Sequence, residues 1–291
     1  MKYWVRNLIV TITLLSVCIT SPLSAVTDNR SLGISPLRNE LTITPGTSFN
    51  GRLTLTNSGQ QQVAIGLTAE VFSVTNSAYD YAFNESGRGV DWVTFSQQSV
   101  TIASKKSATV SYRVAVPIDA EPGGRYLSLF ASSSPENSLD GIVSINRVAS
   151  LLYITVAGDI SRTGNVLTFA SPTIMFGDSF WTATLQNSGT AHFHSIYSIQ
   201  LQSLITRSLV AKTEGDSLIL PGTVRVLTQA IPRPQLLGIY KANYSISLGD
   251  VPARTETRYI VYAPPLQLLL IFAIIAGIWV LVPKKRKELI K

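Results

Sequence analysis

The sequence contains a single cysteine in 291 residues, Cys18, and this residue lies in a segment that we expect to be removed. Without cysteine the remaining chain can form no disulfide bond, so its stability must come from the packing of its core. A metal site built on thiolates is excluded for the same reason.

Charged residues are also scarce, at 14% of the chain. Low charge combined with many aliphatic, Thr and Ser residues is typical of β-rich modules outside the cytoplasm and is poor for a coiled coil or a disordered chain. The sequence lacks the Gly-x-Ser-x-Gly, glycine-rich phosphate-loop and His-Glu-x-x-His motifs. We therefore predict a protein without catalysis and without a cofactor.

Residues 1–25 have the pattern of a secretory signal peptide. Two basic residues precede the apolar run 8–19, and small residues lead to a cleavage site after Ala25. An alternative is a lipoprotein signal ending at Cys18, but the bulky Val17 occupies a position where a small residue is expected. The signal predicts export of the chain that follows.

Residues 264–283 form an apolar run without a charged residue, which is long enough to cross a bilayer as a helix. Four consecutive cations begin the tail 284–291 and would hold it in the cytoplasm: Lys284, Lys285, Arg286 and Lys287. The alternative, a buried core helix, rarely lacks a polar face. The sequence predicts a single-pass protein of the cell membrane, with residues 26–263 outside the cytoplasm.

This topology accounts for the basic isoelectric point of about 9.5. Removing the signal and the tail from the count leaves 17 basic and 16 acidic residues, a net charge of about +1. Such a balance gives no support to nucleic-acid binding.

The exported chain alternates runs of Val, Ile, Thr, Tyr and Phe with turns rich in Gly, Pro, Asn and Ser. A repeat divides it, because GTSFNGRLTLTNSG at 46–59 aligns with GDSFWTATLQNSG at 177–189. We predict an all-β protein of two tandem immunoglobulin-like β-sandwiches, 26–158 and 159–263, followed by the transmembrane helix.

Four repeated residues could mark either the fold or a duplicated ligand site. Asn57 and Asn187 precede Ser-Gly and are typical of turns. Tyr126 and Tyr240 each open a strand after a Pro-containing corner, where sandwich domains place a structural tyrosine corner. We favour the structural interpretation for all four.

The chain resembles the WxL-interacting proteins of Gram-positive bacterial surfaces. The first four stretches below carry the resemblance and the last two are looser: SPLRNELTITPGTSFNGRLTLTN (35–57), VDWVTFSQQSVTIA (90–103), VAVPIDAEPGGRYLSLFAS (114–132), INRVASLLYITVAGD (145–159), ILPGTVRVL (219–227) and LLGIYKANYSISLG (236–249). The resemblance implies a first domain that binds peptidoglycan, a second domain that binds a host protein, and a membrane anchor with a basic tail.

Two groups of residues could carry chemistry. His192 and His194 would face the same side of a strand, but no nearby residue completes a metal site, so we expect them to be packed or solvated. The segment 79–92 combines aromatic and acidic residues that could contact glycan: Tyr79, Asp80, Tyr81, Asp91 and Trp92. Paired carboxylates there could also suggest a glycosidase, and Trp92 could simply belong to the core.

The leading hypothesis is a surface-exposed scaffold held in the membrane, whose first domain contacts cell-wall glycan and whose second contacts a surface protein. Exposed sheet edges could accept a strand of that partner. Two alternatives remain: a chaperone-like or secretion-assembly module that binds partner strands by edge pairing, and a passive structural spacer.

Overall fold

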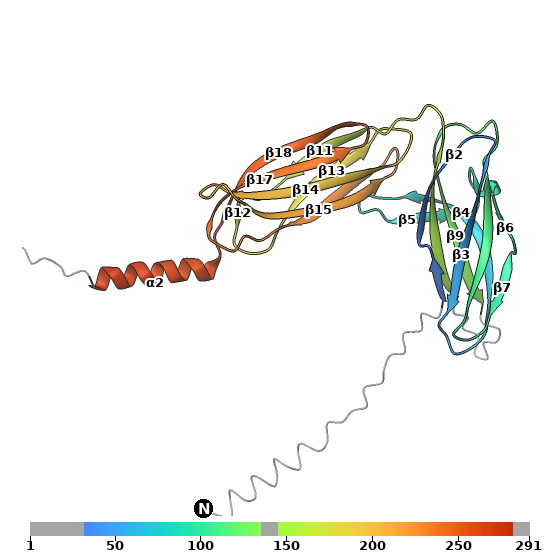
Figure 1. Ribbon diagram of the computed structural model, residues 1–291, viewed down its shortest axis with the longest axis horizontal. Coiled ribbons are helices and arrows are strands. Elements are labelled where there is room, and N and C mark those ends of the chain that lie inside the picture. Colours follow the sequence, from blue (N-terminus) through green and yellow to red (C-terminus); the bar gives the residue numbers. More distant parts are fainter. Residues whose placement is uncertain (1–31, 135–144, 282–291) are drawn as a thin grey trace, which may run out of the picture.

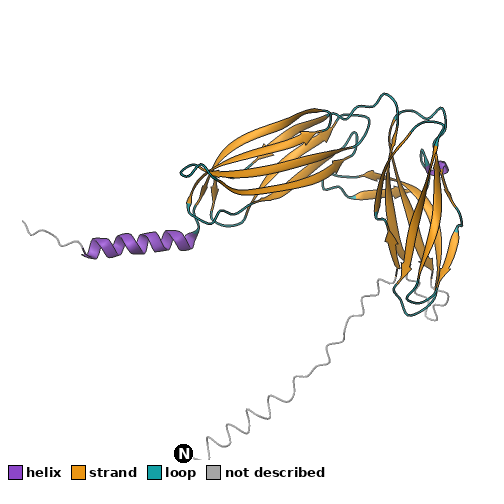
Figure 2. Cartoon of the chain, viewed as in Figure 1, coloured by secondary structure: helices purple, strands orange, loops and turns teal. Residues whose placement is uncertain are grey.

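The computed structural model describes residues 32–134 and 145–281. The predicted signal peptide 1–25, with Cys18, lies outside the described residues. So does the tail that is predicted to be cytoplasmic, with Lys284, Lys285, Arg286 and Lys287. The described chain is all-β apart from one short 3-10 turn and a C-terminal helix. It forms two β-sandwiches, as predicted (Figures 1 and 2).

The first sandwich consists of two sheets. Sheet 1 has the order β1 (Leu32–Ser35), β3 (Ser48–Asn57), β8 (Ser107–Ala115) and β6 (Val93–Phe95). Sheet 2 has the order β2 (Arg38–Ile43), β10 (Asn146–Val156), β9 (Gly123–Ser134), β4 (Val63–Val74) and β5 (Tyr81–Asn84), and β7 (Ser99–Ile102) also pairs with β4. The 3-10 turn η1 (Val90–Trp92) precedes β6.

Alternation of side chains builds the core between these sheets. Leu53 and Leu55 of β3 are fully buried, whereas Arg52 and Thr54, which alternate with them, are exposed. The buried set continues across both sheets, for example Val110 of β8. Because successive residues point to opposite faces, each strand has one buried face and one outward face.

The second sandwich repeats this plan. Sheet 3 has the order β11 (Gly164–Ala170), β13 (Ser179–Asn187) and β16 (Val224–Ile231). Sheet 4 has the order β12 (Ile174–Met175), β18 (Val251–Tyr262), β17 (Gly238–Leu248), β14 (Phe193–Ser203) and β15 (Leu209–Ile219). Its core is centred on Trp181 and Tyr244, whose rings meet edge to face with centroids 5.5 Å apart. The predicted boundary near Gly158 falls between the two sandwiches.

The repeated asparagines make equivalent contacts in the two domains. The Asn57 side-chain amide donates to the Ile102 carbonyl at 3.0 Å, and the Asn187 amide donates to the Ile219 carbonyl at 2.9 Å. Each side-chain oxygen also accepts the N–H of the glycine two residues later. Both side chains are buried, so each asparagine ties its turn to a neighbouring strand of its own sandwich.

The two tyrosines of the repeat differ. The Tyr240 hydroxyl donates to the Leu236 carbonyl at 2.7 Å, four residues upstream, which is the geometry of a tyrosine corner. The Tyr126 hydroxyl instead lies 3.3 Å from Nδ1 of His192 in the second sandwich. The expectation of a corner at Tyr126 is thereby corrected, because the second domain occupies the space beside its ring.

The C-terminal helix α2 (Pro265–Leu281) leaves the far end of the second sandwich (Figure 1). No helix within the described ranges is both long and apolar enough to span a membrane. The described part of this helix ends at Leu281, and residues 282 and 283 of the predicted span lie outside the described residues.

Candidate functional site

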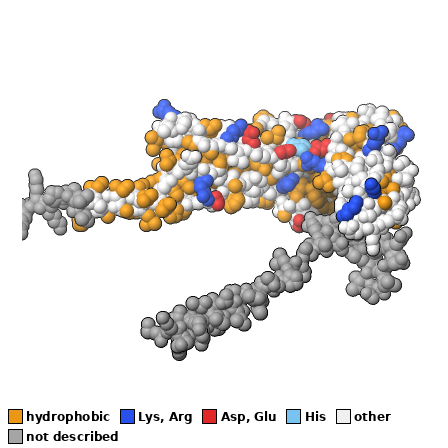
Figure 3. Space-filling view, turned by 60° about the horizontal axis from the view of Figure 1, so that its bottom comes forward, with side chains coloured by type: hydrophobic (Ala, Val, Ile, Leu, Met, Phe, Trp, Pro, Cys, Tyr) orange, Lys and Arg blue, Asp and Glu red, His pale blue; other side chains and the backbone are white. Residues whose placement is uncertain are grey.

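The two sandwiches meet at an angle, and the segments between β4 and β5 and between β10 and β11 bridge the junction (Figure 1). We call this region the joint. Side chains of opposite charge gather there around a histidine (Figure 3). Backbone groups also cross it, since the Gly124 N–H donates to the Thr190 carbonyl at 2.9 Å. The joint is therefore a polar contact between the two domains in addition to a covalent link.

Tyr79 inserts from the β4–β5 loop into the second sandwich. Its hydroxyl oxygen accepts the Leu220 N–H at 2.8 Å and lies 2.7 Å from the Thr223 hydroxyl. The Arg225 guanidinium carbon lies 4.2 Å from the centre of the Tyr79 ring. Only 7% of Tyr79 is exposed, and this burial raises the pKa of its hydroxyl. Tyr79 therefore holds the first domain against the second.

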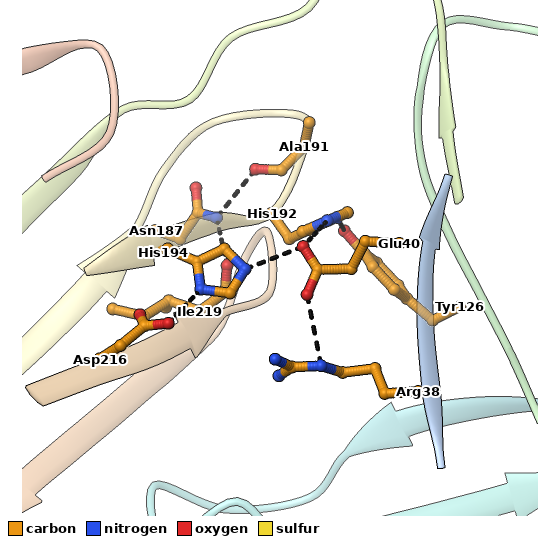
Figure 4. Close-up of polar contacts among 9 residues, drawn as sticks. All are labelled: Arg38, Glu40, Tyr126, Asn187, Ala191, His192, His194, Asp216 and Ile219. Atoms are coloured by element: carbon orange, nitrogen blue, oxygen red, sulfur yellow. Dashed lines mark hydrogen bonds and ion pairs between the residues drawn. The ribbon is translucent and has the colours of Figure 1, made fainter. Parts of the chain in front are cut away.

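His194 bridges two carboxylates from different domains (Figure 4). Its Nδ1 lies 2.6 Å from Asp216 of the second sandwich, and its Nε2 lies 2.8 Å from Glu40 of the first. A ring nitrogen must carry a proton to donate to a carboxylate, so this geometry requires the charged imidazolium. Partial burial lowers the pKa of His194, but the hydrogen bonds to Glu40 and Asp216 outweigh it and raise that pKa overall.

His192 lies beside this bridge in a drier place. Burial lowers its pKa to about 4, an effect that Glu40 only partly offsets, so the ring is neutral at pH 7. Its Nε2 is 3.9 Å from Glu40, and Arg38 also approaches that carboxylate at 3.3 Å. Burial raises the pKa of the neighbouring Tyr126 hydroxyl well above its usual value. One histidine is therefore charged and the other neutral in the same joint.

Both histidines reach Glu40, but among the described residues no group of His, Cys, Asp and Glu could hold a metal ion. The adjoining cleft is also lined by Thr42, Thr155 and Arg162. The cluster supplies an ionic bridge that holds the domains together. Because the cluster contains two histidines, the contact between the domains can respond to pH.

An aromatic layer covers the outward face of sheet 2 next to the joint. The Phe72 and Tyr153 rings meet edge to face with centroids 5.3 Å apart, and Phe83 meets Phe130 at 5.0 Å. Phe83 is nevertheless 41% exposed. Glu70 and Arg147 form an ion pair on the same face, and the Arg147 guanidinium carbon lies 3.4 Å from the centre of the Phe130 ring. Aromatic and paired charged groups thus close this face.

The residues predicted to contact glycan do not form one surface. Tyr79 lies in the joint, and Trp92 is buried in the core of the first sandwich. Tyr81 is part of the aromatic layer, with its hydroxyl 3.4 Å from that of Tyr153. Asp80 accepts a hydrogen bond from Asn76, and Asp91 is exposed in η1. Only three of the five side chains are accessible to a ligand.

Sequence reasoning missed Glu40 and Asp216, the partners of His194. The histidine pair was the one available signal, since it placed two titratable side chains on one face. Its partners lie 154 and 22 residues away along the chain, and nothing in their local sequence distinguishes them from other surface carboxylates.

A second feature is an uncovered edge of sheet 2. The chain passes from sheet 1 to sheet 2 at Pro36, so β2 pairs with β10 only from Leu151 onward. The Leu151 N–H donates to the Leu37 carbonyl on that side. Since backbone groups alternate along a strand, the N–H and C=O of Arg147 and Ala149 point to the same side, and in the described chain no strand pairs with them there.

Side chains around this edge are of two kinds. Val148 points toward the core of the first sandwich, where β1 lies close to β10 with Leu32 and Ile34 buried beside it. Arg147 and Ala149 point the other way, toward the aromatic layer. A strand added here would therefore meet apolar groups on one face and an arginine with aromatic rings on the other.

Comparison with known proteins yields similarity only at the level of fold. No protein-family model matches the chain, and no curated protein matches it. Among solved structures, the class 5 fimbriae chaperone CfaA has 9% identity and a TM-score of 0.43, covering 78% of this chain and 98% of its own. The Pseudomonas aeruginosa CupB2 chaperone has 10% identity and a TM-score of 0.37, covering 78% and 99%.

A third similar structure is a PapD-like domain of human CEP192, with 16% identity, a TM-score of 0.33 and coverage of 48% of this chain and 96% of that domain. Likeness at such identities and TM-scores carries no inference about ligands or partners.

Proposed function

We propose that this protein is a non-catalytic binding protein that captures an extended segment of a protein partner by pairing it with the uncovered edge of β10. The observation that carries the proposal is the pair of outward-facing backbone groups at Arg147 and Ala149. An unpaired edge in a sheet is a template for an added strand, and main-chain hydrogen bonds supply the affinity. This is the edge-pairing function that the sequence left as an alternative.

The surroundings of the edge define the partner segment. Residues of the added strand that point inward would cover Val148 and the side of β1, so they should be apolar. Residues that point outward would meet the aromatic layer and the Arg147 side chain that is already paired with Glu70, so aromatic side chains are favoured.

Selection from a displayed library of short peptides against the full chain in detergent tests the proposal. We expect enriched peptides that alternate apolar with polar residues. Ala149→Pro should abolish their binding, because proline lacks the N–H that points outward at this position. The fold should survive the substitution, because proline is tolerated in an edge strand. Ala149→Val keeps that N–H and is the matched control, which should bind. Enrichment of no peptide, or equal binding by the proline variant, would overturn the proposal.

We further propose that residues 264–283 anchor the protein in a membrane, with the sandwiches outside the cytoplasm, as the resemblance to WxL-interacting surface proteins implies. Apolar side chains project from every side of α2, and Leu266, Phe272 and Trp279 are each at least 67% exposed. Such a helix needs an apolar environment. Flotation of the full chain with lipid vesicles tests the anchor, and Ile274→Arg should reduce it, since a central arginine is costly in lipid.

Contact between the first domain and cell-wall glycan stays a prediction from the resemblance. Of the residues assigned to it, Asp80, Tyr81 and Asp91 are accessible. Sedimentation of the full chain with isolated cell walls tests it, and a triple alanine variant of these residues should then remain in the supernatant.

A further inference from the structure

The outward face of sheet 1 has positive charge without any compensating acid. None of its four strands, β1, β3, β6 and β8, contains Asp or Glu. Arg52 of β3 and Arg113 of β8 are exposed there. In the described chain neither side chain has a hydrogen-bond, ion-pair or ring partner. Both guanidinium groups are therefore available to a ligand.

Most of the other described arginines form a side-chain hydrogen bond or ion pair, and Arg162 and Arg207 are the exceptions. Arg38 and Arg147 on sheet 2 pair with carboxylates, and so do Arg88, Arg233 and Arg254 elsewhere. An exposed ion pair contributes little to stability, so pairing is no requirement of the fold. What distinguishes the sheet 1 face is that its two arginines occur together and no carboxylate lies on its strands to occupy them.

The two arginines line a shallow groove of about 900 Å³. In the register of β3 and β8, Arg52 is opposite Ser111 and Arg113 is opposite Asn50. The arginines are thus diagonal neighbours, at a Cα separation of roughly 7–8 Å. Thr94 of β6 lies opposite Arg113 on its other side. The groove combines two cations with the hydroxyl and amide groups of Asn50, Thr94, Ser96 and Ser111.

The groove has a rigid floor. Tyr112 packs beneath Gly51, where an added Cβ would lie only 2.2 Å from the tyrosine ring, and its hydroxyl accepts a hydrogen bond from Asn39 at 3.0 Å. Gly51 belongs to β3 and Tyr112 to β8, the two paired strands in the centre of sheet 1. Arginines held on such strands keep a fixed spacing, which is what repeated anionic groups require.

We infer that this groove binds an anionic polymer rich in hydroxyl groups, whose phosphate or carboxylate groups pair with Arg52 and Arg113. The planar guanidinium matches the geometry of either oxyanion. The side chains of Asn50, Thr94 and Ser111 would bond to the hydroxyls between successive anions. This site lies on a different sheet from the β10 edge, so the two can be occupied together.

Titration calorimetry on the full chain in detergent, at about 0.15 M salt, tests the inference with three polymers. Polyglycerol phosphate carries phosphate, polygalacturonate carries carboxylate, and dextran carries neither. We expect binding of at least one anionic polymer and none of dextran. The polymer that binds more tightly identifies the preferred anion.

Substitutions separate a built site from general charge attraction. The double variant Arg52→Gln, Arg113→Gln should raise the Kd by about tenfold or more. The double variant Lys212→Gln, Arg254→Gln removes the same charge from the second domain and should leave the Kd unchanged, as should Ala149→Pro. Equal weakening in both double variants, no binding by the unaltered chain, or equal affinity for duplex DNA would overturn the inference.

Discussion

The two outward faces of the first sandwich share one core and differ in their charges. On sheet 2 each described cation has a carboxylate partner, and the face is closed by aromatic rings and by the joint with the second domain. On sheet 1 neither arginine has a side-chain partner within the part of the chain that the structure describes. The difference indicates that pairing accompanies domain contact, whereas the unpaired face is kept for ligands from outside the chain.

Replacing one arginine on each face by alanine should give the largest difference in the free energy of unfolding. Arg147→Ala leaves the Glu70 carboxylate, only 5% exposed, without its partner, and should reduce the free energy of unfolding by about 3–5 kcal/mol. Arg113→Ala on the open face is the matched control and should change it by less than about 0.5 kcal/mol. Urea titration of both variants measures the contrast, and equal effects would remove the distinction between the faces.

Acid should lower the stability of the folded protein through His192, which lies in the joint. Below about pH 6.5 the unfolded chain binds a proton at this residue that the folded chain accepts only near pH 4. Stability should therefore fall by on the order of 3 kcal/mol as the pH decreases across that window. His192→Phe should remove this part of the dependence in thermal unfolding. An unchanged pH profile in the variant would contradict the neutral, buried histidine.

Loss of one hydroxyl should loosen the joint. Tyr79→Phe leaves the buried Leu220 N–H without an acceptor, at a cost of about 1–3 kcal/mol. The matched variant Tyr81→Phe removes only a long contact of 3.4 Å and should cost less. Small-angle scattering should report a broader range of interdomain angles for the Tyr79 variant alone.

His194 gives the smallest effect, of opposite sign to that of His192. Its pKa is raised in the folded chain, so its contribution is complete below the ordinary value near 6.5 and is lost as the pH rises through the raised pKa. The interdomain angle should become more variable at alkaline pH. His194→Gln should make the scattering profile independent of pH there, and persistence of the change would assign it to another group.

The fold could be predicted because its key contacts are made within each domain, whereas the joint between the domains could not be predicted. Asn57, Asn187 and Tyr240 bond within their own domain, close to turns that the sequence marks with Gly and Pro. Tyr126 lies in a local sequence similar to that of Tyr240, but its hydroxyl and that of Tyr79 contact residues of the other domain. A single sequence records which residues alternate along a strand and does not record which face a neighbouring domain will cover.

The same limit applies to the uncovered edge and to the open face. The strands β3, β8 and β10 could be read from alternation, but their neighbours depend on where the chain crosses between sheets. Pro36 marks that crossing, and its effect on Arg147 and Ala149 appears only once β2 and β10 are paired in parallel. Likewise, Arg52 and Arg113 become neighbours only through strand register.

Amide hydrogen exchange resolved by residue in the full chain, without any partner, tests the central claim that the edge of β10 is uncovered. We expect rapid exchange at Arg147 and Ala149 and slow exchange at Val148 and Ser150, whose N–H groups point toward β9. Equal protection at all four positions would mean that the edge is already paired, and would contradict capture of a partner strand there.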